Sequence, residues 1–486
     1  MSNTIIGREP ELVILDRIYS STKPEFLAVY GRRRIGKTFL ISEYFRNKGY
    51  YFELTGSKDT PLKTQLSNFR EEFADAFYSG VKQDMPNSWQ EAFNQLRRKA
   101  EQLEPSKKII LFLDELPWLA SQRSGALKSL EHVWNRYLSR LNNIILIVCG
   151  SAASWMLRKV IYNKGGLYGR LTAEMHLKPF TLSETELYLK AQNVLLNRKQ
   201  IIELYLVFGG VAKYLSHVAQ GKSSAQIIEE NCFLHGGALP LEFQKLYDSL
   251  FDKPQQHIAI VTILAGKKSG MTQDEILKKT GISSGGGFTR LLSDLEDSGF
   301  ILATNEFSYK KKERRYRLVD EYSLFYLTWI KPALENQIKN IAQNYWQSIQ
   351  NSPAYTTWAG YAFEGVCLKH VDKIIDELKI SVVARSATTW SYRPNKNNIQ
   401  KGAQIDLVID RADKCINLCE IKFCNSVFTI TESYAENLGY KKTCFQEQTK
   451  TKKSLFTTLI TSYGALTNPH YLSAVDNQLT MDVLFQ

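Results

Sequence analysis

The sequence predicts an α/β protein made of several domains. Its 486 residues suffice for about three or four domains of ordinary size. Residues 1–180 alternate short apolar runs with helical periodicity, which is typical of a parallel sheet. Residues 181–250 have helical periodicity alone, and residues 332–486 return to a mixture of helices and strands. We therefore expect four regions, with residues 251–331 as the third.

Composition excludes several classes of protein. Hydrophobic residues make up 44% of the chain and charged residues 23%, which excludes wholesale disorder. There is no run of about 18 apolar residues and no secretory pattern at the start, so we expect neither a membrane span nor secretion. Seven scattered cysteines indicate a reducing, cytoplasmic location. The net charge of +13 suits either a polyanionic partner such as DNA or simple solubility.

Five apolar runs are expected to form the sheet of the first region. The third of them along the chain is fully apolar, as expected for a parallel strand that is buried on both faces. That run is Ile109–Leu113, and the other four are Phe26–Tyr30, Tyr50–Leu54, Ile144–Cys149 and Glu174–Leu177.

The first apolar run leads into a phosphate-binding pattern. The sequence GRRRIGKT, which starts at Gly31, fits G-x-x-x-x-G-K-[ST] between a strand and a helix. We expect the backbone at Gly31, Arg34 and Gly36 to curl around the phosphates of ATP, at the positive end of the next helix. Lys37 would reach the β and γ phosphates, and Thr38 would bind Mg²⁺.

Two acids, Asp114 and Glu115, follow the buried run Ile109–Leu113. Ligands of open α/β sheets bind at the carboxyl ends of the strands, where we expect both side chains to lie. Asp114 would hold Mg²⁺ through water, and Glu115 would polarise the attacking water. The alternative role for this pair is to cap the helix that follows.

Three segments together resemble the archaeal-type ATPases of the AAA+/STAND lineage. They are GRRRIGKT, LFLDELPWL and the opening IIGREPEL, and the likeness covers about residues 4–250. The resemblance implies binding and hydrolysis of ATP with Mg²⁺, a helical lid over residues 181–250, and a homo-oligomer. It also implies that Ile6, Gly7 and Arg8 lie beside the adenine and that Ser151 is the sensor-1 residue.

Arg170 precedes the last strand of the core, where AAA+ proteins carry an arginine finger. A guanidinium at the γ-phosphate would stabilise the charge of the transition state, whereas the alternative is a surface arginine. The lid departs from the family, because Gly209 and Gly210 permit a tight turn but the proline of Gly-Gly-x-Pro is missing. No sensor-2 residue is therefore assigned.

The third region resembles a winged helix-turn-helix. A capping box is expected at Thr272 and Glu275. The expected helices are His257–Leu264, Thr272–Lys279 and Phe288–Ser298, and the expected strands of a hairpin are Phe300–Asn305 and Arg314–Val319.

Charge leaves two roles open for this region. The hairpin tip carries Lys310, Lys311 and Lys312, which suit contact with DNA phosphates. The third helix has Arg290 as its basic residue among several acids, which suits a major groove poorly. Nonspecific DNA contact and packing between domains are equally open.

The last region contains two strand-like runs around a polar turn. If they pair as an antiparallel hairpin centred near Asp413, Asp406 lies opposite Glu420, and Lys422 lies opposite Gln404 on the same face. Opposed carboxylates are about 5 Å apart and repel each other unless a cation lies between them. A hard divalent cation, Mg²⁺ or Mn²⁺, suits these oxygen ligands.

A third acid comes from the preceding helix, whose apolar stripe runs from Phe363 to Leu378. Glu364 lies on the apolar side of that stripe, where a carboxylate needs a partner. A metal ion between Glu364, Asp406 and Glu420 would supply one, and Lys422 would orient or activate the attacking water.

This ordered set resembles the PD-(D/E)xK nucleases. Glu364 stands for the helix acid, Asp406 for the first strand acid and Glu420 to Lys422 for E-x-K, followed by a helix. The resemblance implies a restriction-endonuclease-like C-terminal domain that cleaves DNA. The alternatives are a hairpin with surface charges and a nuclease fold that has lost its activity. Lys441, on the helix that follows, could line a DNA groove or lie on a solvated face.

Two functions therefore stand at this point. The first is an ATP-regulated enzyme that acts on DNA through a metal-dependent nuclease domain, in defence or DNA processing. The second is a nucleotide-dependent switch or scaffold whose inactive nuclease fold binds DNA or protein. The sequence identifies no protein partner.

Overall fold

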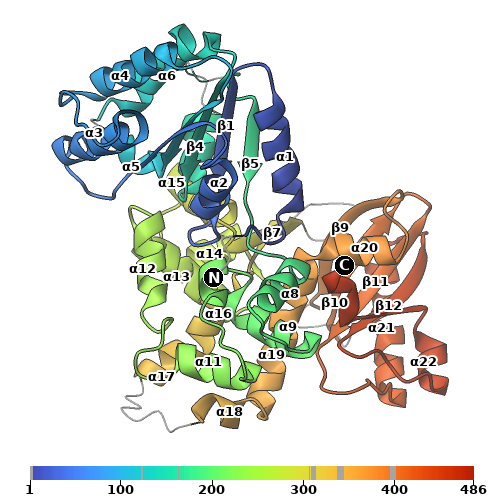
Figure 1. The fold of residues 1–486 in the computed structure, drawn as a ribbon. Coiled ribbons are helices and arrows are strands. Elements are labelled where there is room, and N and C mark those ends of the chain that lie inside the picture. Colours follow the sequence, from blue (N-terminus) through green and yellow to red (C-terminus); the bar gives the residue numbers. More distant parts are fainter. Residues whose placement is uncertain are drawn as a thin grey trace. The chain divides into compact units, whose positions relative to one another are not determined.

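The chain divides at Pro179 into two units, Met1–Pro179 and Phe180–Gln486 (Figure 1). The computed structural model describes residues 4–121, 124–162, 165, 167, 169–305, 307, 314–335, 344–394 and 401–486. The predicted hairpin tip at Lys310, Lys311 and Lys312 lies outside the described residues. The division at Pro179 lies beside the first predicted boundary, and the three-way division of the second unit remains a prediction.

The first unit is built on a parallel sheet of five strands. The apolar runs Phe26–Tyr30, Ile109–Leu113 and Ile144–Cys149 are buried throughout, which explains why they form the central strands, and each predicted strand is confirmed to within one residue at either end. The strands are β1 (Glu25–Tyr30), β2 (Tyr50–Thr55), β3 (Ile109–Asp114), β4 (Ile144–Gly150) and β5 (Ala173–His176). Their order is β2-β3-β4-β1-β5, and all neighbours pair in parallel.

Helices cover both faces of this sheet. One face packs against α1 (Glu9–Ser20) and α2 (Lys37–Phe45), and the other packs against α3 (Leu62–Tyr78), α4 (Trp89–Gln102) and α6 (Ala126–Arg136). Shorter helical segments complete the unit: α5 (Leu116–Leu119), η1 (Leu138–Arg140), α7 (Ala153–Met156) and η2 (Leu157–Ile161).

The second unit begins with helices whose hydrophobic core also includes later parts of the unit, from Phe180 to Phe485. The predicted tight turn is confirmed at Gly209 and Gly210, whose φ angles are +61° and +68°. A Cβ on Gly210 would lie 2.1 Å from the carbonyl oxygen of Phe180. The helices are α8 (Leu182–Ala191), α9 (Arg198–Phe208), α10 (Ala212–Leu215), α11 (Ser224–Cys232) and α12 (Glu242–Leu250).

Three helices and a small antiparallel sheet follow. The predicted capping box is confirmed, because Thr272 and Glu275 each accept the other's backbone N–H. The elements are α13 (Pro254–Ala265), β6 (Met271–Thr272), α14 (Gln273–Thr280), α15 (Gly286–Asp297), β7 (Ile301–Asn305) and β8 (Arg314–Leu318), with strand order β6-β8-β7.

Phe307, beyond the end of β7, packs against the C-terminal sheet. Its N–H donates to the carbonyl of Thr389 at 3.1 Å, and its ring lies 5.1 Å from that of Phe445. This contact favours domain packing as one role of the region.

The helix predicted to run through the apolar stripe is two helices. It ends at His370, whose φ of −106° is not helical and whose ring is fixed by contacts on both nitrogens. The helical segments in this part are α16 (Glu321–Phe325), η3 (Tyr326–Ile330), α17 (Lys331–Glu335), α18 (Tyr345–Ile349), α19 (Pro353–Lys369) and α20 (Val371–Glu377).

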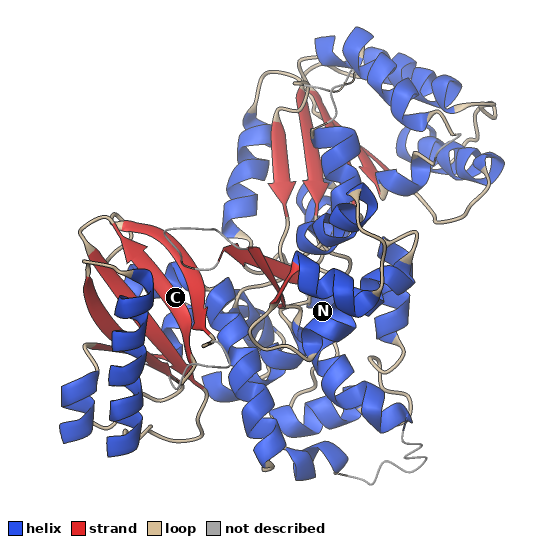
Figure 2. Ribbon diagram, turned by 180° about the vertical axis from the view of Figure 1, so that it is seen from behind, coloured by secondary structure: helices blue, strands red, loops and turns tan. Residues whose placement is uncertain are grey.

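A five-stranded sheet forms the C-terminal part of the second unit (Figure 2). Its elements are β9 (Ala384–Tyr392), β10 (Ala403–Arg411), β11 (Cys415–Lys422), α21 (Glu432–Thr449), β12 (Ser454–Thr461), α22 (Pro469–Ala474), β13 (Asn477–Thr480) and η4 (Met481–Phe485). The order is β13-β12-β11-β10-β9, antiparallel from β9 to β11 and parallel from β11 to β13.

Two helices take opposite faces of the hairpin formed by β10 and β11. Cys419 and Ile421 belong to the same core as α19, whereas Leu418 packs with Phe445 of α21. Within the described part of the chain, no helix is both long and apolar enough to cross a membrane.

Candidate functional site

The predicted phosphate-binding loop connects β1 to α2. Gly31 and Gly36 have φ angles of +145° and +94°, which L side chains rarely adopt. A Cβ on Gly31 would lie 2.1 Å from the carbonyl oxygen of Leu177. Arg34 is also left-handed, with φ +71°. The loop therefore turns tightly, and Gly36 caps the N-terminus of α2, so this helix end faces the loop.

Lys37 is fixed at the mouth of this loop. Its side chain is buried, and its ammonium donates to the carbonyls of Gly31 at 3.0 Å and Arg32 at 2.8 Å. A third hydrogen bond, of 3.0 Å, reaches the hydroxyl of Ser151 just after β4. The structure thus brings the loop lysine and the predicted sensor-1 serine together.

Thr38 and Asp114 meet at the carboxyl end of β3. The Thr38 hydroxyl donates to the Asp114 carboxylate at 2.5 Å, and Asp114 is buried. Hydroxyl and carboxylate oxygens are ligands that suit Mg²⁺, so these two residues fit the ion that the sequence implies.

Glu115 is held by Ser151. The Ser151 N–H donates to one carboxylate oxygen at 3.1 Å, and its hydroxyl donates to the other. The backbone of Glu115 is left-handed, with φ +47°, which turns the chain sharply after β3. Ser151 therefore contacts both the predicted phosphate ligand Lys37 and the predicted water-activating residue.

The opening segment is fastened to the loop through Arg8. Its guanidinium donates to the carbonyls of Lys178 at 2.8 Å and Ile35 at 3.2 Å, and the side chain is buried. Ile6 and Gly7 are half-buried in the same segment. Their predicted place beside an adenine remains a prediction.

Arg170 stands at the other end of the sheet from the loop. It precedes Thr172, whose hydroxyl contacts Glu25 and Phe26 at the start of β1, whereas the loop follows the end of that strand. A strand of this length spans roughly 16 Å at about 3.3 Å per residue. Arg170 is also exposed, so the structure does not bring it to the phosphate loop of its own chain.

The predicted hairpin register is confirmed between Leu407 and Asp410, which pair with Cys419 and Ile416. The predicted pair of Asp406 with Glu420 lies one step beyond these pairs, beside an irregularity in the pairing of β10 with β9 between Ile405 and Val408. Both acids are buried, and the Asp406 carboxylate accepts the N–H of Ile421 at 3.0 Å.

The two buried acids titrate differently. Burial raises the pKa of Asp406 far above its usual value, and the charges of Glu420 and Glu364 raise it further. Burial also raises the pKa of Glu420, but Lys422 and Lys441 more than offset this and hold it below its usual value.

The predicted metal site is not formed in this structure. Glu364 belongs to α19, on the opposite face of the hairpin from Glu420, and pairs with Arg317 of β8 at 2.9 Å. Over the described residues, no group of three or more His, Cys, Asp and Glu side chains is placed to hold a metal ion. The predicted ligands Glu364, Asp406 and Glu420 therefore do not fit a metal ion as they stand. The helix acid Glu364 was expected to share a metal ion with Asp406 and Glu420, but its carboxylate pairs with Arg317 instead.

The sequence did not reveal that Lys441 and Tyr434 contact Glu420. The Lys441 ammonium lies 2.6 Å and the Tyr434 hydroxyl 3.3 Å from the Glu420 carboxylate, besides Lys422 at 2.9 Å. One face of α21 carries Tyr434, Leu438, Lys441 and Phe445. A lysine among residues that are otherwise apolar or aromatic was the sequence feature that could have indicated a buried acidic partner.

Comparison with known proteins agrees with this geometry. Residues 5–218 match the model of an ATPase domain that occurs predominantly in Archaea. An uncharacterised protein of Methanocaldococcus jannaschii, MJECL04, is 26% identical over 427 residues, which cover 86% of this chain and 87% of that protein. An uncharacterised ATP-binding protein of the same organism, MJ0423, is 42% identical over 43 residues, 9% of this chain and 73% of that protein.

Solved structures show likenesses at low identity. The Walker-type ATPase PABY2304 of Pyrococcus abyssi aligns with a TM-score of 0.47 and 17% identity, over 66% of this chain and 96% of that one. The ORC2 protein of Aeropyrum pernix aligns with a TM-score of 0.42 and 16% identity, over 70% of this chain and 98% of that one. The family match and the loop geometry together identify residues 5–218 as an ATPase domain of the predominantly archaeal family.

Proposed function

We propose that the protein binds ATP with Mg²⁺ at the loop between β1 and α2 and hydrolyses it there. The contact of Ser151 with both Lys37 and Glu115 carries this proposal, because it joins the phosphate ligand to the water-activating group. Lys37 would exchange its carbonyl partners for the β and γ phosphates, which attract an ammonium more strongly than neutral carbonyls do. Thr38 would bind Mg²⁺ directly, and Asp114 would bind it through water.

Glu115 is the residue that we assign to the water. The Glu115 carboxylate, at the carboxyl end of β3, accepts a hydrogen bond from the Ser151 hydroxyl. Bound ATP would draw Ser151 and Lys37 toward the γ-phosphate. Glu115 would then be released to orient the attacking water. Arg170, exposed at the far end of the sheet, would serve the site of a neighbouring copy.

Two variants separate binding from hydrolysis. Lys37→Ala should lose most of its ATP affinity, because the phosphates lose their ammonium ligand. Glu115→Gln should bind ATP as tightly as the unmodified protein and lose hydrolysis. Lys63→Ala, at an exposed lysine of α3, is the control. ATP affinity by fluorescence titration and phosphate release would be measured on all four proteins. Normal turnover in Glu115→Gln would refute its role.

We further propose that the C-terminal part is a nuclease-like fold that acts as a DNA-binding switch without a resident metal ion. The specific observation is that each oxygen of Glu420 has its own ammonium partner, while Arg317 neutralises Glu364. The net charge of +13 supports DNA as the partner. Metal-dependent cleavage by Glu364, Asp406, Glu420 and Lys422 is the competing prediction.

A cleavage assay decides between the two. Supercoiled and linear DNA would be incubated with the protein, ATP and either Mg²⁺ or Mn²⁺, with Glu420→Gln as the matched variant. If the C-terminal part is a DNA-binding switch, the protein should bind DNA less tightly as the salt concentration rises. It should also cleave DNA no more than Glu420→Gln does. Cleavage that depends on metal and disappears in Glu420→Gln would establish the nuclease instead.

A further inference from the structure

Glu420 is the most heavily paired carboxylate of the C-terminal cluster. Its side chain is 7% exposed, and its two oxygens have different ammonium partners: Oε1 lies 2.9 Å from Nζ of Lys422, and Oε2 lies 2.6 Å from Nζ of Lys441. A buried carboxylate needs such partners, because it has lost its water. One ammonium would balance its charge, so the second requires an explanation.

The second ammonium comes from a position where a lysine is costly. Lys441 lies on the stripe of α21 that also carries the buried residues Leu438 and Phe445, and its side chain is only 20% exposed. Burial of an ammonium among apolar neighbours is unfavourable unless a carboxylate compensates for it. The fold therefore places a second ammonium at Oε2 of Glu420, although burial disfavours a lysine at this position.

A divalent cation would need the same carboxylate. Any ion held between Asp406 and Glu420 would bind a Glu420 oxygen at about 2.0–2.6 Å, and its two positive charges would repel an ammonium at the same carboxylate. We infer that Lys441 is a built-in counter-ion that competes with a divalent metal ion for Glu420. This inference rests on the metal-free C-terminal fold proposed above and names the residue responsible for it.

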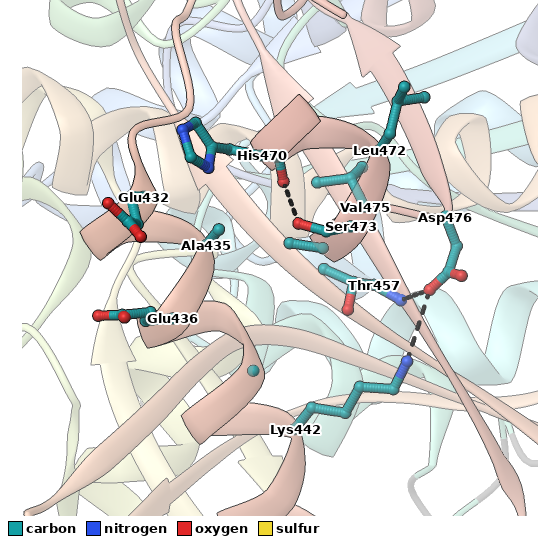
Figure 3. A pocket seen from close by; sticks show the side chains of 12 residues that line it. Glu432, Ala435, Glu436, Lys442, Thr457, His470, Leu472, Ser473, Val475 and Asp476 are labelled. Carbon is teal, nitrogen blue, oxygen red and sulfur yellow. Dashed lines mark hydrogen bonds and ion pairs between the residues drawn. The ribbon is translucent and has the colours of Figure 1, made fainter. Parts of the chain in front are cut away.

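The neighbouring lysine provides a matched control. Lys442 faces a different hollow of about 430 Å³ between α21, β12 and α22. Figure 3 shows its ammonium directed at Asp476, and the ion pair measures 3.7 Å. Asp476 also accepts the N–H of Thr457 at 2.6 Å. Lys442 thus shares the helix and the charge of Lys441 but not its carboxylate.

The test compares Mn²⁺ binding in the full chain without nucleotide. Lys441→Met removes the charge and keeps an unbranched side chain, and Lys442→Met is the control. We expect Lys441→Met to bind Mn²⁺ at least about tenfold more tightly than the unmodified protein in calorimetry. Mn²⁺ should also raise the melting temperature of Lys441→Met more than that of the other two proteins. Lys442→Met should match the unmodified protein.

Further variants keep the inference refutable. Lys441→Gln retains a hydrogen-bond donor to Glu420, so it provides the comparison if Lys441→Met does not fold. Adding Glu420→Gln to either variant should remove the gained Mn²⁺ affinity. The counter-ion role of Lys441 is refuted if Lys441→Met or Lys441→Gln binds Mn²⁺ no more tightly than the unmodified protein. It is also refuted if a gain in Mn²⁺ affinity persists after Glu420→Gln is added. DNA cleavage by the unmodified protein would instead refute the metal-free switch and leave the Mn²⁺ comparison intact.

Discussion

His370 makes the stability of the second unit depend on pH. Its ring is buried at the end of α19, where Nδ1 lies 2.9 Å from the carbonyl of Val366 and Nε2 accepts the N–H of Leu182 at 3.2 Å. A neutral ring with its proton on Nδ1 satisfies both contacts. Protonation of Nε2 would point its new N–H at the N–H of Leu182, so two donors would face each other at the N-terminus of α8.

The size of the effect follows from the pKa. Burial lowers the pKa of His370 from 6.5 to about 4, and the carbonyl of Val366 only partly opposes this. Between these values the unfolded chain binds a proton that the folded chain does not, so stability falls as the pH falls. The difference between a pKa of 6.5 and one of about 4, at roughly 1.4 kcal/mol per pH unit, corresponds to about 3 kcal/mol. This stability is fully present above pH 6.5 and is lost by about pH 4.

Urea unfolding of three proteins at several pH values between about 7 and 4 would measure this. His370→Gln cannot titrate, and His235→Gln removes an exposed imidazole as the control. Because the carboxylates titrate alike in all three proteins, differences between them isolate the histidine. We expect His370→Gln to be less stable than the unmodified protein at pH 7 and this gap to narrow by about 3 kcal/mol toward pH 4. A gap that stays constant across the range would refute the reasoning.

Three further predictions follow from contacts described above. Glu364→Gln should cost about 3–5 kcal/mol of unfolding free energy, because it leaves the buried Arg317 guanidinium without its carboxylate. Arg317→Met should cost less, because Glu364 is only half-buried, and the double variant should cost less than the sum of the two. Gly31→Ala should abolish ATP binding, because its Cβ would lie 2.1 Å from a backbone oxygen; ATP titration with unchanged affinity would contradict this. Arg170→Ala should hydrolyse ATP about 10³-fold more slowly, because Arg170 would act at the site of a neighbouring copy. For the same reason the specific ATPase activity of the unmodified protein should fall on dilution to a monomer.

The nucleotide site was predictable because its signals are local. GRRRIGKT lies between a strand and a helix in the sequence itself, and the apolar run before Asp114 identifies its strand without any distant contact. The hairpin register was predictable for the same reason, since the turn near Asp413 fixes the pairing of Leu407 with Cys419 and of Asp410 with Ile416. Each of these elements is determined within about 20 residues of chain.

The rest depends on how distant elements pack. Arg317 precedes Glu364 by 47 residues, and Lys441 follows Glu420 by 21, so neither pair has a fixed spacing that a sequence pattern reveals. The alternation of a strand predicts which residues share a face but not which helix covers that face. This is why Glu364 was expected beside Glu420 although α19 and α21 cover opposite sides. The break at His370 likewise depends on α8, almost two hundred residues earlier.

The boundary at Pro179 bears on how such a chain can be rearranged by recombination. The family match runs to residue 218, so it includes α8 and α9, yet Leu204 and Phe208 of α9 are buried in the core of the second unit. An exchange of residues 5–218 between two relatives would join halves of two different cores, and their side chains would have to match. An exchange at Pro179 would leave the hydrophobic cores of each unit whole. Crossovers that yield folded chimeras should therefore cluster at Pro179 rather than at the end of the family match.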